Sequence, residues 1–157
     1  MHLYKCNKKI LGVIMIVCCF GHRDAPIEIR EKLKTALLGV MEEHGKITVY
    51  VGNHGGFDFS VVSVVRELQF LRYPVECYVV LSYVPTKINE FVYYRNHQTL
   101  VPEGIEIVHP KGAITYRNFW MIDKAEIVVG YVVKAGGGAA NAIEYAKKKK
   151  KKIIYLS

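Results

Sequence analysis

The chain has 157 residues, 51% of them hydrophobic and 23% charged, a composition that excludes a disordered protein and favours one folded domain with a full core. The net charge is +8, but six of the positive charges form one run, Lys147–Lys152, which excludes a basic surface spread over the whole molecule. The four cysteines lack Cys-x-x-Cys spacing, which argues against a zinc site and favours buried, reduced thiols in a cytoplasmic protein.

The apolar run Ile10–Phe20 has two interpretations. It follows several lysines, as the apolar part of a signal peptide does, but it lacks a small-residue cleavage site and is too short to span a membrane. We therefore expect a buried first strand at Ile14–Phe20, with Cys18 and Cys19 on opposite faces. Residues 1–13 would form an N-terminal extension, with Met15 as an alternative start, and residues 14–157 a single domain without membrane contact.

Strands and helices are expected to alternate along the rest of the chain. The expected strands are apolar and bounded by turn residues; they are Ile14–Phe20, Ile47–Val51, Val75–Tyr83, Gly104–Val108, Glu126–Val133 and Ile153–Leu156. The expected helices have apolar residues at helical spacing or a capping residue at their start; they are Ile27–Glu43, Asp58–Leu71, Ile114–Lys124 and Asn141–Lys148, with Pro85–Tyr94 ambiguous. This alternation predicts an α/β fold, a Rossmann-like three-layer α/β/α arrangement with a mostly parallel central sheet.

Three glycine-containing turns directly follow expected strands: Gly21–Arg23, Gly52–Asp58 and Gly136–Gly138. One such turn alone is often only a turn. In an open α/β sheet, however, ligands bind at the carboxyl ends of the strands, and three turns at that edge favour a cleft there. The third turn leads into an Ala-rich helix, whose free N–H groups and dipole attract an anion, most often a phosphate.

Several side chains in these turns suit a ligand site. Arg23 is able to pair bidentately with a phosphate or carboxylate, and Asp58 either binds a ribose hydroxyl or simply caps a helix. His22 and His54 lack metal-ligand spacing, so no metal is expected. The common dinucleotide, Walker-type and nucleophile-elbow glycine patterns are absent, which disfavours those enzyme classes, and no cofactor is expected.

Four motifs in this order resemble one superfamily. They are Cys-Cys-Phe-Gly-His-Arg (18–23), Gly-Asn-His-Gly-Gly-Phe-Asp (52–58), Arg-Asn-Phe-Trp-Met-Ile-Asp (117–123) and the glycines of the third turn. Together they resemble the SLOG superfamily over residues 14–157, close to its small standalone YpsA-like members. The resemblance implies a Rossmann-like sheet that binds nucleotides or nucleotide-derived ligands. The superfamily includes LOG phosphoribohydrolases, which cleave the base–ribose bond of nucleoside monophosphates, and DprA, which binds single-stranded DNA.

The turns and the resemblance together nominate a set of ligand-binding residues. They are Gly21, His22, Arg23, Gly52, Gly55, Gly56, Asp58, Arg117, Gly136, Gly137, Gly138 and Ala139. Relatives often carry Thr at the position of Ala139, and LOG enzymes carry two glutamates shortly after the glycines, where this chain has Ala142-Ile143 before its nearest acid, Glu144. If the chain is a hydrolase of N-glycosidic bonds, Asp58 or Glu144 would have to be the catalytic acid.

The expected function is therefore binding of a nucleotide or nucleotide-derived ligand, as a sensor or a sequestering module, with N-glycosidic hydrolysis left open. The alternative is a single-stranded nucleic-acid-binding protein related to DprA, with Lys147–Lys152 as a contact. A solvated surface is the favoured interpretation of that lysine run. The resemblance also makes a homo-oligomer plausible.

Overall fold

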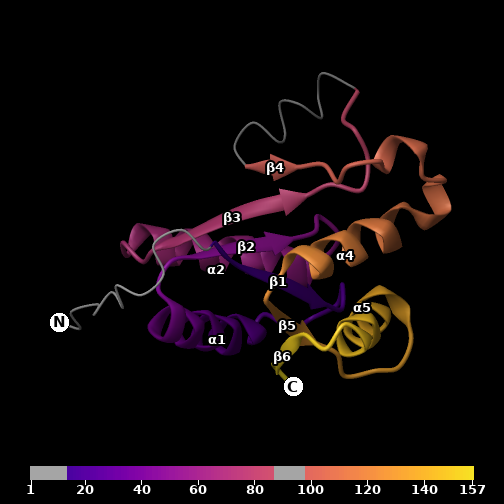
Figure 1. Ribbon diagram of the computed structural model, residues 1–157. Coiled ribbons are helices and arrows are strands. Elements are labelled where there is room, and N and C mark those ends of the chain that lie inside the picture. The colour runs from indigo at the N-terminus through magenta and orange to yellow at the C-terminus, as the bar shows by residue number, and fades with distance from the viewer. Residues whose placement is uncertain (1–13, 87–97) are drawn as a thin grey trace.

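The computed structural model describes residues 14–86 and 98–157 (Figure 1). The expected N-terminal extension, residues 1–13, and most of the ambiguous segment Pro85–Tyr94 lie outside the described residues. Six strands form one sheet, and every pairing between them is parallel. The strands are β1 (Met15–Gly21), β2 (Ile47–Val51), β3 (Val75–Val80), β4 (Thr99–Leu100), β5 (Ile127–Tyr131) and β6 (Lys152–Tyr155).

Helices cover both faces of this sheet (Figure 1). They are α1 (Ile29–His44), α2 (Gly56–Phe70), α4 (Ala113–Lys124) and α5 (Gly137–Lys148), with short 3₁₀ turns η1 (Ile105–Ile107) and η2 (Pro110–Gly112) before α4. One apolar cluster joins α1 and α2 to the sheet, and a second cluster joins α4 and α5 to its other face. The predicted Rossmann-like α/β/α fold is therefore confirmed. None of these helices is both long and apolar enough to cross a membrane.

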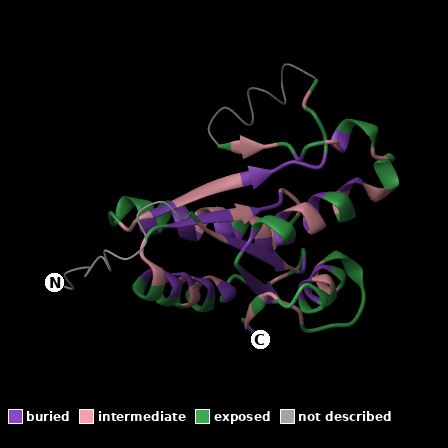
Figure 2. Ribbon diagram, in the orientation of Figure 1, coloured by how far each residue is buried: buried purple, intermediate pink, exposed green. Residues whose placement is uncertain are grey.

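The central strand β1 shows why the two clusters stay separate. Val17 and Cys19 belong to the cluster with α1 and α2, whereas Cys18 and Phe20 belong to the cluster with α4 and α5. Figure 2 shows β1 and its neighbours largely buried, as expected for a parallel sheet covered on both faces. The prediction that the two cysteines face opposite sides is confirmed. Burial raises the pKa of both thiols, so they stay protonated and unreactive.

The strand order creates a crevice beside β1. The order across the sheet is β4-β3-β2-β1-β5-β6, so the chain builds outward from β1 in one direction and then returns to place β5 on the other side. At such a switch point, the connections after the two adjacent strands diverge to opposite faces and leave an opening at their carboxyl ends. The turns after β1 and β5 border this opening.

One expected strand is wrong. The segment Gly104–Val108 is not a strand: Gly104 has a φ of 81° and the 3₁₀ turn η1 follows it. The short edge strand β4 is Thr99–Leu100 instead, paired with β3. A run with only three apolar residues does not distinguish a strand from a turn that buries one of them, and here Ile105 alone is buried while Ile107 is 85% exposed.

Two helices begin at least two residues earlier than expected. Helix α2 begins at Gly56, so Asp58 lies inside its first turn, where it accepts a hydrogen bond from the backbone N–H of His54 at 2.9 Å. The interpretation of Asp58 as the N-cap residue of this helix is therefore wrong, because Gly55 holds that position. Helix α5 begins at Gly137 and not at Asn141. Glycine has a low helix propensity, so the sequence favours a later start, but the glycine turn itself forms the first turn of the helix.

Gly21, the last residue of β1, lets α2 approach the sheet. A Cβ atom at this position would overlap the ring of Phe57. That ring stacks on Tyr131 at the end of β5, with 6.5 Å between ring centroids and 11° between ring planes. Because Gly21 has no side chain, the ring of Phe57 packs closely against the end of β1.

We expect Gly21→Ala to lower the free energy of unfolding by about 1–3 kcal/mol, because the added methyl group overpacks the Phe57 contact. Gly39→Ala is the matched control, since a Cβ there meets nothing within 4 Å. Gly39 lies inside α1, so this change should stabilise the chain by about 0.5–1 kcal/mol. Urea unfolding of both variants measures the difference, and equal stability of the two would contradict the described packing.

Candidate functional site

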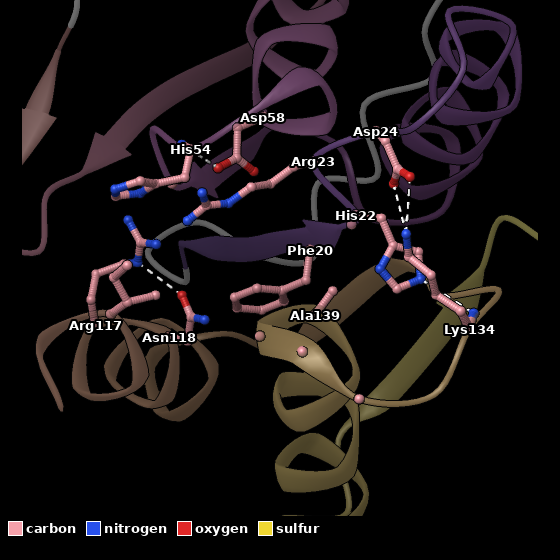
Figure 3. Close-up of a pocket in the computed structure, with 16 residues that line it drawn as sticks. Phe20, His22, Arg23, Asp24, His54, Asp58, Arg117, Asn118, Lys134 and Ala139 are labelled. Carbon is pink, nitrogen blue, oxygen red and sulfur yellow. Dashed lines mark hydrogen bonds and ion pairs between the residues drawn. The ribbon is translucent and has the colours of Figure 1, made fainter. Parts of the chain in front are cut away.

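A cavity of about 470 Å³ opens at the carboxyl ends of β1, β2 and β5, at the switch point of the sheet. Four segments form it: the turn after β1, the turn between β2 and α2, the first half of α4, and the glycine turn that begins α5 (Figure 3). The lining residues are Phe20, Gly21, His22, Arg23, Asp24, Gly52, His54, Asp58, Ile114, Arg117, Asn118, Lys134, Gly136, Gly137, Gly138 and Ala139.

The structure brings most of the predicted ligand-binding residues together around this cavity. Gly55 and Gly56 do not line it. A Cβ at Gly55, where φ is 93°, would lie 2.6 Å from Cβ of Arg23, and the N–H of Gly56 donates to the carbonyl of Arg23 at 2.7 Å. These glycines therefore pack against the backbone of Arg23 on the side away from the cavity, and Gly56 hydrogen-bonds to it. Glu144 also lies outside the cavity lining, exposed on α5 and paired with Lys147 at 2.9 Å.

Arg117 places a buried positive charge at the cavity. Its side chain is only 3% exposed and comes from α4. The guanidinium donates to the Asn118 side chain at 2.8 Å and to the backbone carbonyl of Val80 at 2.9 Å, with a longer contact of 3.4 Å to Asn53. All three acceptors are neutral, and no carboxylate of the described residues forms an ion pair with it. Gly52 leaves room for the guanidinium because it has no side chain: a Cβ there would lie only 2.8 Å from Nη1 of Arg117.

The charge on Arg117 is retained despite burial. Burial lowers the pKa of this guanidinium, and the nearby Asp58 carboxyl partly offsets the effect. Arginine nevertheless stays protonated in proteins because its ordinary pKa is so high. A buried cation without an anionic partner is costly in free energy. The arrangement is therefore suited to a ligand that supplies the negative charge.

Arg23, His54 and Asp58 surround the same space (Figure 3). Burial raises the pKa of Asp58 from its ordinary value of 3.8 to about 6, against opposing effects of the His54 amide, Arg117 and Arg23. Burial, together with the same two guanidinium groups, lowers the pKa of His54, which favours a neutral ring at pH 7. The Nδ1 atom of His54 is buried and has no hydrogen-bond partner among the described residues.

His22 joins the turn after β1 to the turn after β5. Its ring is buried, and Nε2 accepts hydrogen bonds from the backbone N–H groups of Val133, at 3.0 Å, and Lys134, at 3.4 Å. The Lys134 ammonium also pairs with Asp24 at 2.9 Å. These contacts fasten the glycine turn against β1. In the part of the chain that the structure describes, no three His, Cys, Asp or Glu side chains converge to hold a metal ion.

The glycine turn leaves the start of α5 open to the cavity. Gly136 and Gly137 have φ values of 78° and 85°, which side-chain-bearing residues rarely adopt, and a Cβ at either would meet nothing within 4 Å. No side chain caps the helix at Gly136. Its first N–H groups therefore lack a capping side chain, as in anion-binding helix starts. Ala139 lines the cavity without a hydroxyl group to add a further contact.

Sequence reasoning did not select five of the lining residues, namely Phe20, Asp24, Ile114, Asn118 and Lys134. His54 also lines the cavity, although its sequence context suggests it only as a metal ligand. Two of these had a usable signal: Asn118 follows Arg117 directly, and Ile114 lies three residues before Arg117, on the same helix face. Lys134 had none, because its side chain reaches Asp24, 110 residues away in sequence.

The run Lys147–Lys152 lies at the other end of α5, away from the cavity lining (Figure 1). Three of its lysines pair with acids: Lys147 with Glu144 at 2.9 Å, Lys152 with Glu43 at 3.7 Å and Lys149 with Asp123 at 3.9 Å. These exposed pairs reduce the positive charge that the run presents to a ligand. The favoured interpretation of the run as a solvated surface agrees with this placement.

Comparison with known proteins finds a similar fold among the solved structures. No protein family and no curated protein sequence matches this chain. Among solved structures, DNA processing protein A from Helicobacter pylori, described for its single-stranded DNA binding mode, matches with a TM-score of 0.64 and 15% sequence identity. The match covers 90% of this chain but only 64% of that chain. At this identity the likeness shows a shared Rossmann-like fold, and membership of the SLOG superfamily remains a prediction.

Replacement of His22 should loosen the glycine turn. We expect His22→Leu to speed hydrogen exchange at the Val133 and Lys134 amides and to lower the free energy of unfolding by about 1–2 kcal/mol, because both amides lose their acceptor. His22→Gln offers a carbonyl oxygen and should retain much of the protection. Equal exchange rates in the two variants would show that the ring does not hold the turn.

The pKa of Asp58 predicts a specific pH dependence. Because its folded value, about 6, lies above the ordinary 3.8, Asp58 contributes stability below about pH 4 that is lost as the pH rises through 6. Asp58→Asn keeps an acceptor for the His54 amide but does not ionise. Relative to the unchanged chain, its free energy of unfolding should therefore rise by about 2–3 kcal/mol between about pH 4 and pH 7.5. Urea unfolding at both pH values tests this; a constant difference would contradict it.

Proposed function

We propose that the chain binds single-stranded nucleic acid and holds a phosphate group of one nucleotide in the cavity. The observation that carries this proposal is the meeting of two guanidinium groups, those of Arg23 and Arg117, with the uncapped start of α5 in one cavity. Guanidinium groups and helix N-termini are the common protein partners of phosphate oxygens. The similarity in fold to DNA processing protein A, described for single-stranded DNA binding, supports the choice of nucleic acid.

In this proposal the residues have distinct roles. Arg117 attracts the phosphate from the buried side of the cavity, and Arg23, which is exposed and has no ion-pair partner among the described residues, reaches it from the turn after β1. The N–H groups after Gly136 bind the remaining oxygens, and His22 positions that turn. Lys147–Lys152 contributes only a general attraction, because half of these lysines are already paired with acids.

A free nucleotide or nucleotide-derived ligand is the second candidate, with the chain acting as a sensor or a sequestering module. The depth of the cavity favours it: Arg117 is 3% exposed, and about 470 Å³ is in the range of small-molecule pockets, roughly 300–1,000 Å³. If such a ligand is also hydrolysed at its N-glycosidic bond, Asp58 is the better candidate acid of the two that the sequence suggests, since it lines the cavity and Glu144 does not.

Fluorescence anisotropy with a labelled oligothymidylate of about fifteen nucleotides tests the proposal, with thymidine monophosphate as competitor. Arg23→Gln should weaken binding about tenfold or more, because a charge-assisted contact to phosphate is lost. The control, Lys148→Gln with Lys150→Gln, removes charge far from the cavity and should weaken binding less than about threefold at physiological salt.

Two other outcomes would reject nucleic-acid binding through the cavity. Loss of oligonucleotide binding in the lysine variant, with the Arg23 variant unaffected, would move the contact to the lysine run. Binding of thymidine monophosphate without any binding of the oligonucleotide would favour the sensor or sequestering module.

A further inference from the structure

We propose that the cavity recognises a phosphate monoester, the terminal phosphate of a nucleotide or of a nucleic-acid strand, in preference to the phosphodiester inside a strand. This inference deepens the proposed function and rests on phosphate binding in the same cavity. It concerns which phosphate is bound. Its two sources, a free nucleotide and a strand end, share the same chemical group and are separated by the experiment below.

The charges that line the cavity favour a dianion. Lys134 and Asp24 pair with each other at 2.9 Å, which leaves Arg23, Arg117 and Asp58 to face the ligand. Asp58 is mostly ionised at pH 7, because burial raises the pKa of its carboxyl only to about 6, but an arriving anion raises that pKa further and favours uptake of a proton when the ligand binds. Two guanidinium charges then face the ligand without a carboxylate between them. A phosphate monoester carries a charge of about −2 near neutral pH, whereas a diester in a strand carries only one negative charge.

The positions of the donors favour three free phosphate oxygens. Arg117 approaches from α4, Arg23 from the turn after β1, and the N–H groups after Gly136 from the turn after β5 (Figure 3). The protein hydrogen bonds of Arg117 in the described residues use Nε and Nη1, so Nη2 is available for a ligand. A monoester offers three non-ester oxygens to these three directions, and a diester offers only two.

The depth of the cavity gives an independent steric reason. The guanidinium of Arg117 is almost fully buried, so a phosphate must enter deeply to reach it. A phosphodiester carries a sugar on two of its oxygens, and both sugars would have to leave through the same opening between the turns. A terminal phosphate carries only one sugar, so only one sugar has to extend out through that opening. The buried Nδ1 of His54, which has no partner among the described residues, adds a polar group that a ligand sugar is able to satisfy.

The test compares matched ligands on the full chain near neutral pH. Two oligothymidylates of equal length, one with a 5′-phosphate and one with a 5′-hydroxyl, are titrated by anisotropy, and the pair is repeated with a 3′-phosphate. We expect at least about a tenfold lower Kd for a phosphate-bearing end, as one added charge-assisted contact implies. Thymidine 5′-monophosphate should compete, and thymidine should not. Equal Kd values for phosphate and hydroxyl ends, within about twofold, would overturn the inference and leave nucleic-acid binding intact.

Variants show whether the cavity is responsible for the preference. Arg23 is exposed, so its replacement should not disturb the fold as loss of the buried Arg117 would. Arg23→Gln should reduce the ratio of the Kd values for hydroxyl and phosphate ends to about threefold or less. Lys148→Gln should leave the ratio unchanged, and a ratio that follows the lysine variant would overturn the assignment to the cavity.

The two sources of the monoester give different results. Tight competition by thymidine monophosphate, at a Kd similar to that of the oligonucleotide, identifies the free nucleotide as sufficient. Binding of the 5′-phosphorylated strand alone identifies the strand end. If no oligonucleotide binds but thymidine monophosphate raises the melting temperature and thymidine does not, the nucleic-acid proposal fails and the monoester inference stands. Failure of every phosphate-bearing ligand rejects both.

Discussion

The cavity depends on the buried guanidinium of Arg117 and on the neutral groups that hold it. Its hydrogen bonds reach the end of β3 through Val80, the turn after β2 through Asn53, and its own helix through Asn118. One side chain thus joins α4 to two strand ends, while no carboxylate of the described residues forms an ion pair with it. Arginine suits this position because its planar group donates in several directions and keeps its proton when buried.

Small residues make this arrangement sterically possible. Gly52 leaves the space that the guanidinium occupies, and Gly21 leaves the space for Phe57, which sets the approach of α2 to β1. Gly55 and Gly56 do not line the cavity but contact the backbone of Arg23, which does. The glycines around the cavity therefore have two functions. Those before α2 provide room for neighbouring groups, whereas Gly136 and Gly137 provide a backbone conformation that leaves the start of α5 open.

Much of the candidate site followed from the sequence because it depends on the topology of parallel sheets. Turns that follow parallel strands meet at one edge, so Gly21, Gly52 and Gly136 were expected to be neighbours, and the cavity lining contains all three. The contacts made by Lys134 and His22 were not predictable, since both link the turn after β1 to the turn after β5, more than 100 residues away. Such contacts depend on side-chain directions that sequence spacing does not encode.

The α/β class, the order of the main strands and helices, and the edge at which the turns converge were all predictable from the sequence, because apolar periodicity and glycine placement are local signals. Three features could be seen only in the folded structure: Gly104–Val108 is a turn, Asp58 lies inside α2, and Arg117 is buried without an ion-pair partner among the described residues. Burial and charge compensation depend on what surrounds a side chain in space. For the same reason, the cluster of charges on which the proposed phosphate site rests becomes visible only after the chain has folded.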